Sequence, residues 1–223
     1  GFAPWAFAGV FTAVWVTMAT AWDLWDKSAS KMGRWYGLKR QSRSYYGMVF
    51  GHLGLAMVIA GATVVSNYGI ERDVRMVPGG SAEVGDYTVV FNYIGERQGP
   101  NFRAEYGEFD VFLDGKQVAS LHPEKRHYPV GMSVMTEAAI DAGLFRDVFI
   151  AIGERISDEA WAIRLQYKPL VRWLWLGSLV MAIGGFLAIS DKRYRIRVRS
   201  EAKDPASTGE TGAAGSKPAE ANA

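Results

Sequence analysis

The sequence contains no cysteine, and its 223 residues carry a net charge of only +2. Any domain outside a membrane therefore has no disulfides, and zinc sites with Cys ligands and thiol nucleophiles are excluded from these residues. A charge so close to neutral gives no reason to expect nucleic acid as a partner. The sequence shows no glycine-rich phosphate-binding loop, no Ser/His/Asp arrangement of a catalytic triad and no pair of carboxylates for acid–base catalysis. We therefore assign no catalytic residue.

Charge is also scarce in three apolar stretches, although the mean hydropathy of the chain is −0.03. Each stretch is close in length to the ~20 residues that an α-helix needs to cross a bilayer. They are Trp5–Ala21, Tyr45–Ser66 and Leu170–Ile189. The first has no basic segment before it and no small-residue cleavage site, so it is not a signal peptide. Because the chain begins with Gly1, we expect a longer protein whose N-terminal part is absent here.

Basic residues flank these stretches unevenly. The segment before the second stretch contains Lys27, Lys31, Arg34, Lys39, Arg40 and Arg43. The segment after the third contains Lys192, Arg193, Arg195, Arg197 and Arg199. Basic loops favour the cytoplasmic side, so we expect residues 67–168 on the opposite side, which is the periplasm in a bacterium.

These patterns predict an integral membrane protein, with a three-span α-helical bundle and an extramembrane β-rich sandwich or barrel. The expected order is helix 1–22, basic cytoplasmic loop 23–44, helix 45–66, periplasmic domain 67–168, helix 169–190 and cytoplasmic segment 191–223. Membrane lipid is therefore an expected partner. The end, 200–223, has no large apolar residue, and its Ala/Gly/Ser/Pro/Glu-rich composition predicts disorder.

The middle region has the signals of a β domain. Runs rich in β-branched and aromatic residues, some of them alternating, predict strands at Tyr87–Ile94, Phe109–Leu113, Lys116–Ser120, Arg146–Ile152 and Trp161–Tyr167. The pair Asp114-Gly115 predicts a two-residue type I′ hairpin turn. Thr136–Ala142 is interpreted as one short helical turn that stops at Gly143.

His52 is the only histidine inside an apolar stretch. A titratable ring in the hydrocarbon region is costly without a partner, so it is either a functional residue or one that hydrogen-bonds to a neighbouring helix. Gly51 and Gly54 favour a bulky planar ligand such as haem, for which neutral imidazole is a common axial ligand. Gly47 and Gly51 also form a GxxxG pair, which is typical of helix–helix packing.

His122 and His127 lie in LHPEKRHYP, which we interpret as a polar loop between strands. Two histidines five residues apart suggest a metal site, but no third ligand is evident. The alternative is a structured loop in which Glu124 pairs with a nearby Lys or Arg.

Three motifs resemble the CcmF family and its NrfE-type relatives, the haem-lyase subunits of bacterial cytochrome c maturation. They are PEKR (Pro123–Arg126), MTEAAID (Met135–Asp141) and the closing WLG…GG…DKRYR pattern, which ends at Arg195. The GHLGLA segment around His52 is similar to a transmembrane histidine segment of that family. The resemblance covers Ser44–Arg195 and, more weakly, the first apolar stretch.

The resemblance implies an inner-membrane protein that attaches haem to apocytochrome c in the periplasm. Its partners would be haem, a haem chaperone, apocytochrome c and other maturation proteins. His52, beside Gly51 and Gly54, would be an axial ligand of a b-type haem with a redox role. The second ligand would lie in the missing N-terminal part, as would the family's tryptophan-rich segment, so we do not expect this chain alone to catalyse ligation.

Two other classes of protein remain open. One is a membrane-anchored scaffold whose β domain docks partners without haem. The other is a transporter fragment, which ranks last because transport predicts paired polar groups at the bilayer midplane.

Overall fold

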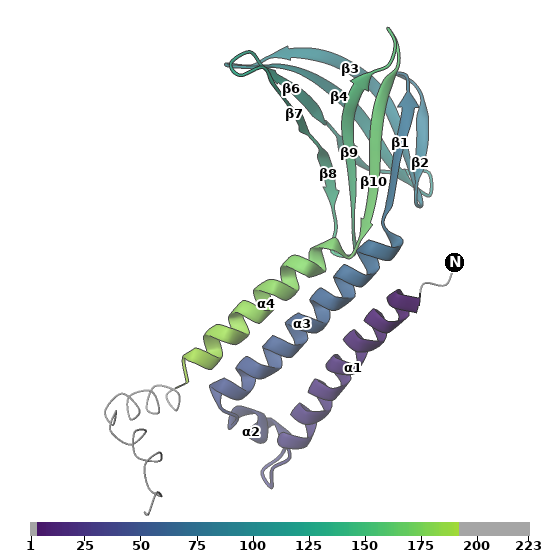
Figure 1. Ribbon diagram of the computed structural model, residues 1–223. Helices are drawn as coiled ribbons and strands as arrows, with labels where there is room; N and C mark the ends of the chain where they lie inside the picture. The colour runs from purple at the N-terminus through teal and green to yellow at the C-terminus, as the bar shows by residue number, and fades with distance from the viewer. Residues whose placement is uncertain (1–3, 192–223) are drawn as a thin grey trace, which may run out of the picture.

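The computed structural model describes residues 4–191, which form a layer of long helices and a β-sandwich at one end of it (Figure 1). The basic residues after Asp191 and the stretch for which the composition predicts disorder lie outside the described residues.

Within residues 4–191, three helices are long and apolar enough to cross a membrane, and they coincide with the three apolar stretches. They are α1 (Pro4–Lys27), α3 (Arg43–Tyr68) and α4 (Val171–Ile189). α3 lies between the other two, as Figure 1 shows. The segment expected as a loop contains one short helix, α2 (Arg34–Lys39), at the end of the helices remote from the sandwich.

Glycines bring α3 and α4 into backbone contact. A Cβ on Gly54 would lie 2.5 Å from the carbonyl oxygen of Gly177, and a Cβ on Gly47 would lie 2.6 Å from that of Gly184. Close backbone approach is a usual basis of helix association in lipid. The prediction that the GxxxG pair packs against a neighbouring helix is therefore correct for only one of its two glycines. Gly47 contacts α4, whereas the Cβ direction of Gly51 has nothing within 4 Å, because packing here follows a seven-residue spacing.

The sandwich consists of two antiparallel sheets. The first has the order β1-β10-β9-β8 and the second has the order β2-β3-β4-β6-β7, with β5 also paired to β4. The first sheet contains β1 (Ile70–Met76), β8 (Ala139–Ala142), β9 (Arg146–Arg155) and β10 (Trp161–Pro169). The second contains β2 (Ser81–Val84), β3 (Tyr87–Gln98), β4 (Arg103–Leu113), β5 (Lys116–Leu121), β6 (Glu124–Tyr128) and β7 (Ser133–Glu137).

Alternating side chains of both sheets form one apolar core. Phe91 and Phe109 are fully buried and stack with ring centroids 4.6 Å apart. The facing sheet contributes Ile150, Ile163 and Leu165, which are also fully buried. Burying side chains of this size contributes about 1.5–3 kcal/mol each, which explains how the sandwich is held without disulfides.

The predicted hairpin turn is confirmed, and two other predictions are wrong. Asp114 and Gly115 have φ values of 50° and 73°, as a type I′ turn requires, and Leu113 pairs with Lys116. Thr136–Ala142 is not a helical turn, because all of its residues except Ala138 belong to β7 and β8, which pair with β6 and β9. The PEKR segment is not a loop, because β6 pairs with both β4 and β7.

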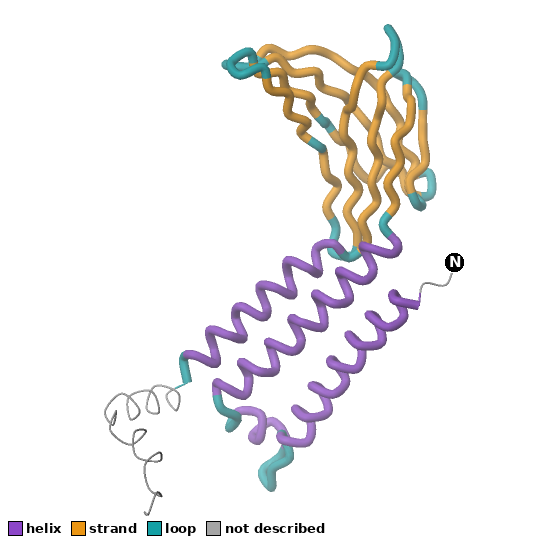
Figure 2. The backbone as a smooth tube through the Cα atoms, in the orientation of Figure 1, coloured by secondary structure: helices purple, strands orange, loops and turns teal. Residues whose placement is uncertain are grey.

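The helices continue directly into adjacent strands. Only Gly69 separates α3 from β1, and only Leu170 separates β10 from α4. β1 and β10 are paired, with Ile70 opposite Tyr167. Figure 2 shows the resulting arrangement, in which short loops lie where the strands meet the helices.

Candidate functional site

His52 lies in a groove between α1 and α3. The groove has a volume of about 300 Å³, and α3 contributes Met48 and His52 to its wall. The glycines that contact α4 are on another side of α3, so the imidazole is turned towards α1. The α1 wall consists of Thr12, Trp15, Val16, Ala19, Thr20 and Asp23.

One hydrogen bond fixes the tautomer of His52. Its Nδ1 lies 2.9 Å from the carbonyl oxygen of Met48, one helical turn earlier. A carbonyl oxygen only accepts, so Nδ1 carries the proton and donates it. In the neutral ring, Nε2 then keeps its lone pair and is free to bind a metal. A hydrogen bond from the other ring nitrogen is also the usual way in which proteins orient a ligating histidine.

The two glycines expected beside a bound macrocycle differ in their surroundings. Gly51 has open space in its Cβ direction, but it is not among the residues that line the groove of His52. Gly54 packs against Gly177 of α4, so it serves helix packing and offers no room beside the helix. The described residues therefore offer one imidazole ligand in the groove and, separately, an open Cβ direction at Gly51.

The contribution of α1 was missed by sequence reasoning. Trp15 lies in the middle of the first apolar stretch, where the sequence gives it no role, and the structure places it in the wall of the His52 groove. Asp23 closes the same groove near the α2 end, where its carboxylate accepts a hydrogen bond from Tyr45 (2.7 Å) and pairs with Lys27 (2.9 Å). Asp23 is therefore neutralised by its own neighbours.

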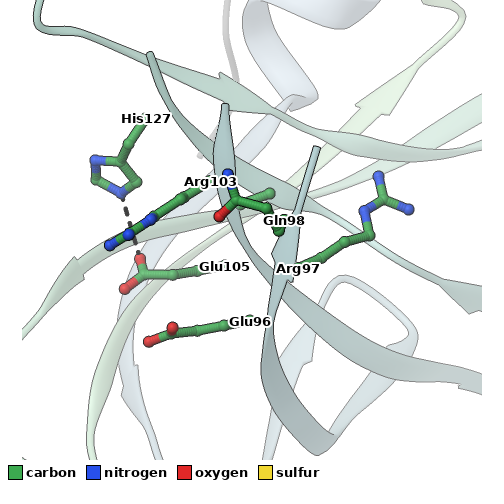
Figure 3. Close-up of a pocket in the computed structure, with 7 residues that line it drawn as sticks. Glu96, Arg97, Gln98, Arg103, Glu105 and His127 are labelled. Atoms are coloured by element: carbon green, nitrogen blue, oxygen red, sulfur yellow. Dashed lines mark ion pairs between the residues drawn. The ribbon is translucent and has the colours of Figure 1, made fainter. Parts of the chain in front are cut away.

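His127 belongs to a second hollow, of about 690 Å³, on the sandwich. Figure 3 shows His127 next to Glu105, with Arg103 beside them, while Arg97 points away from this group. His127 Nε2 and a carboxylate oxygen of Glu105 are 3.7 Å apart. His122 lies instead in the short connection between β5 and β6. Within residues 4–191, no group of three or more His, Asp or Glu residues is close enough to hold a metal ion.

The PEKR segment joins the two sheets. Pro123 is fully buried, and the side chain of Lys125 is only 6% exposed. The Lys125 ammonium donates to the carbonyl oxygen of Gly153 on β9, at 3.1 Å. Glu124 pairs with Arg97 and Arg126, which confirms the expected local ion pairing.

Comparison with known proteins gives consistent matches. Residues 67–169 match the family model described as the CcmF C-terminal beta-sandwich. The chain is 44% identical over 201 residues to the cytochrome c-type biogenesis protein CcmF of Pseudomonas aeruginosa, covering 90% of this chain and 30% of that protein. It is 48% identical over 162 residues to CcmF of Escherichia coli, covering 73% and 25%. It is 35% identical over 195 residues to NrfE of Haemophilus influenzae, covering 87% and 28%.

A solved structure titled "Cytochrome c Heme Lyase CcmF" matches with a TM-score of 0.56 at 19% identity, covering 70% of this chain and 28% of that one. At this identity the match supports the fold alone. The chain spans at most about 30% of the length of these curated relatives.

The three apolar helices and the sandwich beside them define a membrane protein with an extramembrane β domain, as the sequence predicted. The chain belongs to the CcmF family of cytochrome c-type biogenesis proteins and corresponds to its C-terminal part. The resemblance drawn from the PEKR, MTEAAID and DKRYR motifs is therefore confirmed.

Proposed function

We propose that this chain is the C-terminal part of a haem-lyase subunit, and that His52 is an axial ligand of a b-type haem. The observation that carries this proposal is the tautomer of His52, whose Nε2 is free inside an apolar groove of a span. Protonation of Nδ1 towards Met48 holds the ring in one orientation. Close packing of α3 on α4 keeps the helix that presents it in place.

The rest of the site is assigned to a longer protein. His52 supplies one ligand, and the second lies in the part of the family that this chain does not contain. The open face at Gly51 allows a flat group to approach the backbone. When bound between two imidazoles, such a haem supplies low-spin, one-electron redox chemistry.

The sandwich is proposed to lie in the periplasm and the α2 end in the cytoplasm, across a bacterial inner membrane. Six basic residues lie between Lys27 and Arg43, at the end remote from the sandwich. Haem, a haem chaperone, apocytochrome c and other maturation proteins are the proposed partners. Reporter fusions test this topology: a periplasm-only reporter should be active at Gly115 and inactive at Thr208, and the reverse pattern contradicts it.

The haem assignment is tested by the reduced-state absorption spectrum of the full-length protein. We expect His52→Ala to lose haem or its low-spin spectrum, whereas His127→Ala, a control on the sandwich, retains both. A normal low-spin spectrum at normal occupancy in His52→Ala would show that His52 is a packing residue.

A partner-docking scaffold without haem is the second candidate function, because the hollow around His127 has charged residues of both signs on its wall. In that case His52→Ala and the parent protein have the same spectrum. If both functions operate, Arg126→Ala lowers partner binding or protein level while the haem spectrum stays unchanged. Loss of haem from a stably expressed Arg126→Ala protein would contradict that separation.

A further inference from the structure

The turn between β8 and β9 has an unusual composition for a turn outside a membrane. It consists of Gly143, Leu144 and Phe145, and the two large apolar residues are 54% and 64% exposed. Turns in water are dominated by Gly, Pro, Asn, Asp and Ser. Exposed apolar side chains do not identify a contact by themselves, since Val130 and Met132 in the β6–β7 turn are 89% and 91% exposed, so the position of the β8–β9 turn has to decide.

The backbone fixes this turn at the start of the α4 span. The amide of Leu170, the N-cap residue of α4, donates to the carbonyl oxygen of Phe145 at 2.8 Å. The Phe145 ring also contacts Trp173, with centroids 6.3 Å apart. In Figure 1, β8 and β9 accordingly reach down to the first turn of α4.

The length of α4 sets the depth of the turn. Its 19 residues extend over about 28 Å at ~1.5 Å per residue. The hydrocarbon core of a bilayer is about 30 Å thick. Val171, the first residue of α4, therefore lies near the boundary between hydrocarbon and headgroups, and the bonded turn lies at the same level.

The surroundings of the turn suit a lipid surface. An apolar groove of about 590 Å³ runs from Leu144 past Phe149 to Trp175 and Leu176. It continues into the exposed side of α4, which carries Leu179, Ile183 and Phe186. Two cations lie at the same level: Arg172 pairs with Asp147 at 3.1 Å, and the Lys168 ammonium lies 5.0 Å from the Phe149 ring centroid. Apolar and aromatic residues flanked by Lys and Arg are typical of membrane interfaces.

We propose that the β8–β9 turn is a membrane anchor, in which Leu144 and Phe145 insert into the headgroup boundary of the leaflet next to the sandwich. The occupant of the groove is phospholipid, because the apolar surface is continuous with the exposed side of a span and the ammonium of Lys168 suits phosphate, whereas Arg172 is already paired with Asp147. The inserted turn then fixes the orientation of the sandwich relative to the bilayer. This inference does not depend on haem or on His52.

The absence of cysteine allows a direct depth measurement. In the full-length protein, with any cysteine outside these 223 residues replaced by serine, Leu144→Cys is labelled with a nitroxide, and the protein is placed in phospholipid nanodiscs. Collision rates are measured with oxygen, which concentrates in the membrane, and with a water-soluble nickel chelate. Val130→Cys, in the 89% exposed position of the β6–β7 turn, is the control in water. Ile140→Cys lies four residues up β8, about 13 Å from the tip at ~3.3 Å per residue.

We expect the ratio of oxygen to nickel collisions to be several-fold higher at residue 144 than at residue 130, with residue 140 between them. Equal nickel access at residues 144 and 130 would place the turn in water and overturn the proposal. Exclusion of both reagents at residue 144 would indicate a protein partner and would overturn it too. Ala142→Cys, a small change at an exposed position two residues before Leu144, gives the same comparison if the first label disturbs the turn.

Discussion

The Lys125 ammonium on β6 lies 2.9 Å from the Glu154 carboxylate on β9, and this contact joins the two sheets of the sandwich. The two side chains differ greatly in exposure, at 6% for Lys125 and 88% for Glu154. A lysine buried to this extent needs fixed acceptors, which are this carboxylate and the carbonyl oxygen of Gly153.

Lys125→Ala should therefore destabilise the sandwich. The substitution leaves the Gly153 carbonyl without its partner, which costs about 1–3 kcal/mol. Lys125→Met removes the same donor but fills the space, so it separates the loss of the contact from the loss of packing. Thermal unfolding of the chain in detergent, followed by the β signal in circular dichroism, should give a midpoint below that of the parent protein for both variants, and the lowest for Lys125→Ala. Equal midpoints for Lys125→Ala and the parent protein would mean that the contact does not hold the sheets together.

Acid should weaken the same contact. The hydrogen bond from Lys125 lowers the pKa of Glu154 below its usual value of 4.5. A carboxyl whose pKa is lower in the folded state stabilises the fold above the unfolded-state pKa, and that stabilisation is lost as pH falls through the folded-state pKa. The contribution of Glu154 is therefore full above about pH 5 and disappears on acidification below its usual value.

Unfolding midpoints measured from pH 6 to pH 3 check this pH dependence. The parent protein should lose more stability over this range than Glu154→Gln, which has no carboxyl to protonate. Asp73 should behave in the same way on β1, because a hydrogen bond from Arg164 of β10 lowers its pKa. Parallel curves for the parent protein and Glu154→Gln would show that this pair does not contribute to the pH dependence.

Gly54→Leu should separate α3 from α4. Even the Cβ would lie 2.5 Å from the Gly177 carbonyl oxygen, so the helices have to move apart. Gly51→Ala is the control on the same helix, since nothing lies within 4 Å of its Cβ position. We expect a much lower thermal midpoint in detergent for Gly54→Leu and a change of at most a few degrees for Gly51→Ala. The opposite ranking would contradict the packing of these helices.

Gly115→Val should destabilise the β4–β5 hairpin. Gly115 has a φ of 73°, which a β-branched residue adopts only with strain. Such strain costs on the order of 1–3 kcal/mol. Gly115→Asn is the control, because asparagine tolerates the left-handed region. The midpoint of unfolding should fall in the order parent, Asn, Val, and an unchanged midpoint for Val would count against the type I′ turn.

The sequence predicted those parts of the fold whose pattern is local. Uninterrupted apolar stretches mark the spans, and Asp114-Gly115 marks its turn because the requirement for positive φ acts on those two residues alone. β1 and β6 were missed for a shared reason. Their sequences, IERDVRM and EKRHY, are highly charged, and they are strands only because neighbouring strands pair with them.

The candidate site, like the fold, was predictable from the sequence only where the signal is local. His52 stands out as a histidine in a span, but its groove depends on how α1 lies against α3, which no local pattern specifies. Gly51 and Gly54 look equivalent in the sequence. Their difference depends on which side of α3 faces α4. Residues three apart are only about 60° apart around a helix, so Gly54 faces α4 directly while Gly51 lies at the edge of the contact.

The direct passage of α3 into β1 and of β10 into α4 makes the sandwich and the helix pair torsionally stiff. A domain on one flexible tether rotates freely about it. Here two connections of one residue each lie side by side, so a rotation of the sandwich has to twist both of them. The hydrogen bonds between β1 and β10 prevent the two connections from separating. A sideways force on the far end of the sandwich is therefore a torque on the base of α3, the helix that carries His52.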